Sequence, residues 1–179
     1  MLGGNCLYPS EYIDFLAHYH GDRDYFECHE LLEDYWKKTD PKNKNSIWVG
    51  FILLSVSAYH HRRSNFSGAR RTLIKAIKIF ELHSDFLTKL GINHVDFYHL
   101  LNRQITALQK GELYRSISLP LSNSTLLEAA KKVSEQKGFT WGNESDLTNN
   151  LLVNRHKLRD RSTIIEERNQ SLKMRKGSE

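Results

Sequence analysis

The sequence predicts an all-α fold, a compact bundle of about five core helices followed by a C-terminal helical appendage. Three observations lead there: apolar residues recur three or four positions apart, no stretch alternates like a strand, and only 3 prolines occur among 179 residues. With 39% apolar and 26% charged residues, the chain has the composition of an ordinary globular protein and the length to bury one core. We expect a core domain over residues 1–118 and an extension over 119–179, partly disordered at its end.

Turn and capping residues divide this pattern into successive helices. The third expected helix is apolar nearly all round, which is typical of a central helix that others surround. Gly50 and Ser57 lie on one of its sides, so a neighbouring helix could approach closely there. In order, helices are expected from Ser10 to Gly21, from a cap at Asp22 or Asp24 to Pro41, from about 46 to the turn at 65–68, and over about 69–90, 93–111, 126–136 and 146–173.

The most informative stretch is residues 26–36, FECHELLEDYW. At 3.6 residues per turn, His29 and Glu33 share a helical face with Phe26, Leu32 and Trp36, so the pattern points a histidine and a carboxylate into the core. Buried polar groups cost free energy unless they find partners. We therefore expect either a polar network or a ligand at this place.

A second block follows at residues 48–69, where an apolar run after Gly50 leads to YHHRRSN and then to Gly68 and Ala69. The two blocks together resemble the signature of a bacterial family catalogued as domain of unknown function 309, over roughly residues 11–90. Ser64 stands where that family often has glycine, and Leu53 near a position where glutamine is common. The resemblance implies a compact all-helical fold and an uncharacterised protein without an assigned activity.

The pair His29–Glu30 with Glu33 differs from the zinc-protease pattern His-Glu-x-x-His, because a carboxylate stands where the second histidine is needed. A histidine and a carboxylate at i and i+4 can still hold a metal if another helix supplies a third ligand. His60, in line with the apolar face of the third helix, is the obvious candidate, and His61 is equally arguable. The candidate metal ligands are thus His29, Glu33 and His60.

Three interpretations of this site stay open. His29 and Glu33 could form a purely structural network with the basic residues of the second block, or line a pocket for a small ligand. They could also act as catalytic residues on a small anionic substrate, with Glu33 as a general base whose burial raises its pKa. No cofactor is indicated. The candidate site residues are His29, Glu30, Glu33, Trp36, His60, His61, Arg62, Arg63 and Asn65.

The net charge of +5 and the pI near 9.2 favour anionic partners. Basic residues gather between 62 and 78 and again in the tail from Leu151 onward, so nucleic-acid binding is an alternative, although aromatic residues for base stacking are scarce. No segment reads as a membrane span or a secretory signal, and Cys6 and Cys28 are expected to be reduced thiols in a cytoplasmic protein. The leading hypothesis is a helical binding or scaffold module. Tyr8, Tyr98 and Tyr114, which fit no helical stripe, make a homodimer plausible.

Overall fold

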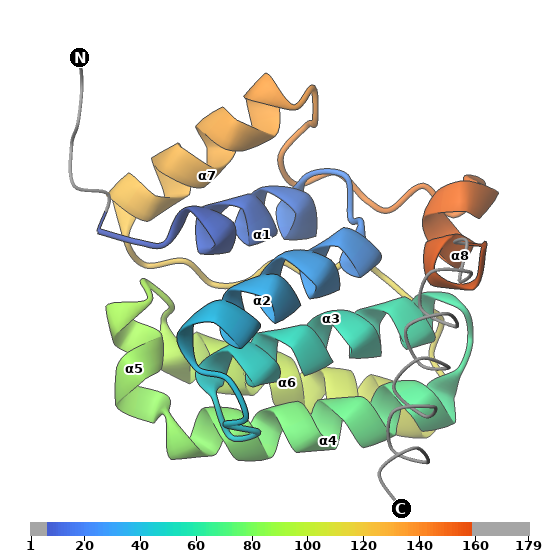
Figure 1. Cartoon of the computed structure of the whole chain (residues 1–179). Coiled ribbons are helices and arrows are strands. Elements are labelled where there is room, and N and C mark those ends of the chain that lie inside the picture. Colours follow the sequence, from blue (N-terminus) through green and yellow to red (C-terminus); the bar gives the residue numbers. More distant parts are fainter. Residues whose placement is uncertain (1–6, 159–179) are drawn as a thin grey trace, which may run out of the picture.

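The computed structural model describes residues 7–158 and folds them into helices (Figure 1), with one isolated bridge between Ile92 and Leu121. The all-α prediction is confirmed. Within the described residues, no helix combines the length and the apolar character that a membrane span requires. The helices are α1 (Ser10–His20), α2 (Tyr25–Thr39), α3 (Ile47–Arg62), α4 (Phe66–Leu82), α5 (Ser84–Lys89), α6 (His94–Lys110), α7 (Ser124–Gln136) and α8 (Asn150–Leu158).

Side-chain caps set several of the helix starts. The Asp24 carboxylate accepts the N–H of Glu27 at 3.0 Å and opens α2, and the side-chain oxygen Oδ1 of Asn65 accepts the N–H of Gly68 at the start of α4. One expected helix is wrong: the segment 69–90 forms two helices, because the backbone leaves helical geometry at His83, where φ is −127°. The expected last helix is described only as α8, with a kink at Asn154; the basic tail from residue 159 and Cys6 lie outside the described residues.

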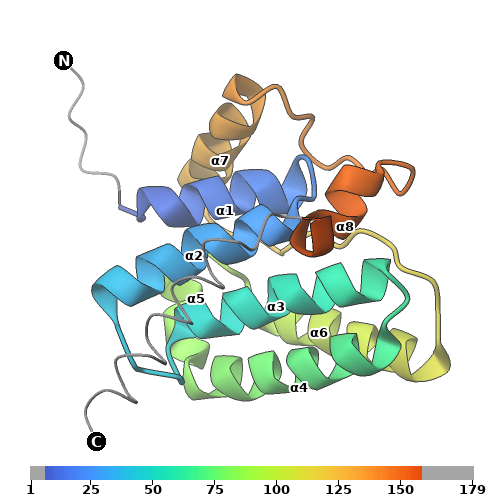
Figure 2. The ribbon, with the colours of Figure 1, turned by 45° about the vertical axis from the view of Figure 1, so that its right-hand side comes forward.

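The third helix is central, as its all-round apolar pattern predicted. It lies between α2 and α4, with α6 on the far side, while α7 covers the outer side of α1 (Figures 1 and 2). Helix α4 approaches α3 closely at the two small residues: a Cβ on Gly50 would lie 2.8 Å from the Phe80 ring, and the Ser57 hydroxyl donates to the carbonyl of Ala69 at 2.9 Å. A larger side chain at Gly50 would therefore push α4 away.

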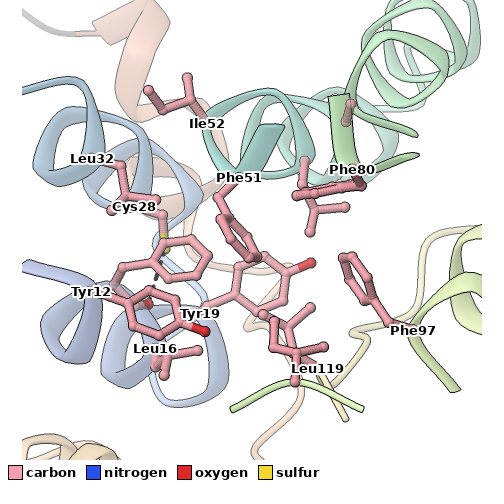
Figure 3. Packing of buried hydrophobic residues seen from close by; sticks show 14 of the residues in the cluster. Tyr12, Leu16, Tyr19, Cys28, Leu32, Phe51, Ile52, Phe80, Phe97 and Leu119 are labelled. Carbon is pink, nitrogen blue, oxygen red and sulfur yellow. Dashed lines mark hydrogen bonds between the residues drawn. The ribbon is translucent and has the colours of Figure 1, made fainter. Parts of the chain in front are cut away.

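The core is rich in aromatic rings, which meet where α1, α3, α4 and α6 converge (Figure 3). The Phe51 ring lies 5.6 Å from Phe15 and 5.0 Å from Phe80, and Phe80 contacts Phe97 edge-on at 4.9 Å between ring centroids. Such tilted and edge-to-face pairs add to the free energy of burial. This rigid centre fixes α3, and hence the direction in which its last turn points.

The segment after residue 118 contacts the helices before it. Lys137, directly after α7, pairs with Asp14 of α1 at 3.3 Å, and the Trp141 ring stacks on His20 with 4.4 Å between centroids. The expected boundary at residue 118 stays a prediction, since these contacts join the two parts without showing whether either folds alone.

The three tyrosines without a stripe have places inside the molecule. Tyr8 is buried in the core, and Tyr98 and Tyr114 pack against it half-buried. The Tyr114 hydroxyl lies 2.5 Å from that of Tyr25 and 3.1 Å from that of Ser116. These tyrosines are therefore accounted for by packing within one chain and give no support to a homodimer. The homodimer stays a prediction.

Candidate functional site

Helix α2 is rotated relative to the orientation expected from its sequence. Its fully buried residues are Tyr25, Cys28 and Leu32, whereas the side chains of His29 and Glu33 are 26% and 31% exposed. The prediction that the His–Glu pair lies inside the core is therefore wrong; the pair lies at its margin. Cys28 is a buried free cysteine, and burial raises the pKa of its thiol.

The pair is nevertheless assembled as a cluster. His29 Nδ1 lies 2.9 Å from the Glu30 carboxylate, and Nε2 lies 3.7 Å from that of Glu33, which also pairs with Lys37 at 3.1 Å. One ligand atom from each of His29, Glu30 and Glu33 falls within 4.8 Å of the others. Within residues 7–158, Glu30 thus replaces the expected His60 as the third potential metal ligand.

The two histidines at the end of α3 have different surroundings. His61 is buried, and its Nε2 lies 2.8 Å from the carbonyl oxygen of Glu112. His60 is half-buried, and its Nδ1 lies 3.1 Å from Nδ2 of the Asn65 side chain, an NH2 group that can only donate. Nδ1 of His60 is therefore the acceptor, and the proton of the neutral ring resides on Nε2.

The arginines at this end hold the C-terminal segment. The buried Arg62 donates to the carbonyls of Arg23 and Leu152 at 2.7 and 3.0 Å and to the Ser145 hydroxyl at 2.9 Å. Arg63 lies over the ring of Tyr59 and donates to the Asn154 side chain at 2.8 Å. The hydrogen bonds and ring contacts of both arginines are with residues other than His29, Glu30 and Glu33. The polar network expected between these arginines and the His–Glu pair is therefore not formed among the described residues.

Arg155 of α8 completes the attachment by pairing with Asp24, the cap of α2, and with Glu27 at 3.6 Å. As a result, α8 lies against the start of α2 and the end of α3 (Figure 2).

A pocket of about 250 Å³ lies where α2, α3 and α8 meet. It brings together His29 of the first motif and His60 of the second, whereas Glu33, expected as a ligand beside them, is not among its lining residues. Aromatic rings frame it: Phe26 and Tyr59 contact His156 edge-on at 5.6 and 6.2 Å between centroids. Its remaining lining residues are Tyr25 and Val56.

The electrostatics favour a neutral imidazole on the α3 side of this pocket. Burial lowers the pKa of His60, and the positive charges of Arg63 and Arg71 lower it further. With Nδ1 engaged by Asn65, the neutral ring offers an N–H donor at Nε2. The pocket therefore combines aromatic faces with at least one hydrogen-bond donor.

Trp36 and Asn65 make contacts within the fold. Trp36 packs half-buried against the core, and its indole N–H donates to the carbonyl of Asn43 at 3.0 Å. Asn65 caps α4 and orients His60. The sequence did not identify His156 as a pocket residue, because no apolar stripe includes it. It also did not identify Arg23 as buried, because Arg23 stands between two aspartates and resembles a surface residue.

Comparison with known proteins decides the family. A family model described as "Domain of unknown function (DUF309)" matches residues 12–72. "Uncharacterized protein YpuF" of Bacillus subtilis (strain 168) is 41% identical over 172 residues, which cover 96% of this chain and 99% of that protein. The chain belongs to the DUF309 family. The stretch that matches the DUF309 model contains both motifs that line the pocket and ends before α8. No solved structure matches significantly.

Proposed function

We propose that the protein is a binding module that takes a small molecule in the pocket between α2, α3 and α8. The observation that carries the proposal is the convergence of His29 and His60, from two separate motifs, on one aromatic-framed pocket. Concave sites that combine aromatic walls with a few polar groups are the usual form of small-ligand sites. The proposal includes a cytoplasmic location, which the free thiol of Cys28 supports, since reducing compartments keep thiols unpaired.

The lining indicates what kind of molecule fits. The rings of Phe26 and Tyr59 offer flat apolar faces, and Nε2 of His60 offers a donor to an acceptor atom. A small planar molecule that bears a carboxylate or carbonyl oxygen would satisfy both. Benzoate and benzamide are suitable probes, because they share the ring and differ in charge.

The test follows the histidine ring signals of the ¹³C-labelled full chain by NMR while each probe is added to concentrations on the order of 10 mM. We expect the signals of His29, His60 and His156 to shift together, and Val56→Phe, which fills the pocket, to abolish the shifts. Val95→Phe, on the exposed side of α6, is the matched control and should shift like the parent. The proposal would be contradicted if neither probe shifted these signals, or if the signals shifted equally in Val56→Phe.

A divalent cation at His29, Glu30 and Glu33 is a second candidate, favoured by the mutual approach of their ligand atoms. Elemental analysis of the purified protein should then find about one metal ion per chain, and Glu30→Gln should lose it. Asp34→Asn, an exposed acid on the same helix, should keep the metal. Protein without metal whose His29 ring signal does not respond to added zinc would remove this candidate.

The catalytic alternative loses part of its basis. Glu33 was favoured as a general base because the sequence predicted its burial, whereas its side chain is 31% exposed and paired with Lys37. Catalysis by His29 and Glu33 stays a prediction that no contact in this structure supports specifically.

A further inference from the structure

A row of cations runs along the outer face of α4. It consists of Arg70, Arg71, Lys75 and Lys78, and all four side chains are exposed. None of the four forms an ion pair with any residue between 7 and 158. Uncompensated charges of one sign on one helix face give a local positive potential that attracts anionic partners.

The row borders an open groove of about 590 Å³ between α4 and α6. The apolar part of its lining comes from Phe66, Ile74 and Leu108, of which Ile74 is the most exposed. The α6 side adds Gln109 and no charge. The groove is therefore amphipathic: an apolar lining is bordered by a cationic wall on one side and a neutral wall on the other.

We propose that this groove binds an acidic amphipathic helix of a partner protein. Charge complementarity selects the acidic partner, because every charged side chain that lines the groove is a cation. The apolar residues select an amphipathic one, since a helix can lay its apolar stripe into such a groove through residues at i, i+3 or i+4, and i+7. From Ser67 to Lys78 the groove spans about 17 Å, or three turns of a docked helix.

Nucleic acid fits the same surface less well. Single strands bind through aromatic platforms beside basic residues. The groove contains one aromatic ring, Phe66, which is half-buried and lies 5.7 Å from the ring of His61. An apolar residue such as Ile74 contributes nothing to phosphate contacts, whereas a peptide would bury it. The role of Ile74 therefore separates the two partners experimentally.

The experiment measures fluorescence anisotropy of a labelled peptide of 14 residues that carries leucines on one helical face and glutamates on the other. A scrambled peptide of the same composition tests whether the amphipathic pattern matters. With the full chain we expect micromolar binding of the patterned peptide and at least about tenfold weaker binding of the scrambled one. Equal binding of both peptides, or no binding of the patterned peptide at protein concentrations on the order of 1 mM, would overturn the proposal.

Variants locate the site. Arg71→Glu combined with Lys75→Glu should weaken peptide binding by about tenfold or more, and Ile74→Asp should weaken it comparably. Lys89→Glu, a charge reversal on an exposed lysine of α5 outside the groove, is the control and should bind like the parent. A 20-nucleotide single strand serves as competitor: if it binds more tightly than the peptide and Ile74→Asp leaves that binding unchanged, the surface is a phosphate site and the proposal fails.

Discussion

Two groups of basic residues, only a few positions apart in the sequence, have opposite structural roles. Arg62 and Arg63 at the end of α3 are engaged by carbonyls, hydroxyls, amide groups and aromatic rings, and they attach the C-terminal segment to the core. Arg70, Arg71, Lys75 and Lys78 on α4 are exposed and have no ion-pair partner between residues 7 and 158. In the sequence the two groups look like one basic cluster.

The difference shows that the density of basic residues in a sequence does not distinguish buried arginines that attach one segment to another from exposed cations. We call the first the attached group and the second the displayed group. What distinguishes the groups is the helix face on which each residue falls. Arg62 continues the buried side of α3, where its guanidinium lies 4.9 Å above the Tyr25 ring, while the α4 cations occupy the side opposite Ala69, Leu73 and Ala76. The attached group should therefore govern stability, and the displayed group should govern binding.

The largest effect is expected at Arg23, which extends the attached group. This side chain is 1% exposed and donates to the carbonyls of Tyr19, Ile117 and Asn143 at 2.7 to 2.8 Å. Arg23→Met should lower the free energy of unfolding by about 3–5 kcal/mol, because one buried carbonyl and two partly buried hydrogen bonds lose a charged donor that is itself buried. Urea denaturation followed by circular dichroism measures this loss.

Arg103→Met is the matched control, since Arg103 is exposed on α6. Its free energy of unfolding should stay within about 0.5 kcal/mol of the parent. Similar losses in both variants would break the distinction between attached and displayed arginines.

A buried polar group without a hydrogen-bond partner should make the free energy of unfolding depend on pH. His20 tests this. Neither of its ring nitrogens has a hydrogen-bond partner among the described residues, and burial, with the charge of Arg23, lowers its pKa from 6.5 to about 3. The unfolded chain takes up the proton below pH 6.5, whereas the folded chain does so only near pH 3. Stability from this group is therefore complete above pH 6.5 and falls with decreasing pH, by about 2 kcal/mol at pH 5.

His20→Phe keeps a ring to stack on Trp141 and cannot take up the proton. Between pH 7.5 and 5 the parent should lose about 2 kcal/mol more unfolding free energy than this variant. His99→Gln, at an exposed histidine, should keep the pH dependence of the parent. An identical pH dependence in His20→Phe and the parent would show that His20 is not the titrating group.

A smaller effect is expected at the His29 cluster. Its side chains are half-exposed, so its ion pairs are screened by solvent. His29→Ala and Glu33→Gln should each change the free energy of unfolding by less than about 1 kcal/mol, measured by the same denaturation. A loss of about 3–5 kcal/mol in either variant would instead mean that the pair is a buried structural network, as one interpretation of the sequence had it.

The sequence predicted the helices well because caps and apolar periodicity are local signals. Asp24 and Asn93 each accept the backbone N–H that their position indicated, while Asn65, expected in a turn, caps α4 three residues before the expected start of that helix. The sequence predicted the buried face of α2 incorrectly, because Tyr25, Phe26 and Trp36 suggested an apolar stripe that passes through His29. The real stripe passes through Cys28, a short side chain that fits between α1 and α3, where its thiol lies 3.7 Å from the carbonyl of Phe15.

Only the part of the pocket that α2 and α3 supply could be predicted from the sequence. Both of its motif histidines stand in patterned segments, whereas His156 belongs to a short kinked helix whose position depends on long-range contacts such as Arg62 to Leu152. No periodicity within α8 encodes those contacts. Sites built by a returning segment are thus the part of a fold that a single sequence reveals least.

The displayed group should have the smallest effect on stability. Arg71→Glu combined with Lys75→Glu removes two like charges from a crowded cationic row and leaves every described contact of α4 with the core in place. Relief of repulsion among cations three and four residues apart should offset the loss of the arginine and lysine stems, so the free energy of unfolding should change by less than about 0.5 kcal/mol. Thermal unfolding at low and at high salt measures this: a small gain in stability at low salt that disappears at high salt identifies relieved repulsion. A loss of several kcal/mol would instead place these cations with Arg23 and Arg62 as attachments of the fold, and the contrast between the two groups would no longer hold.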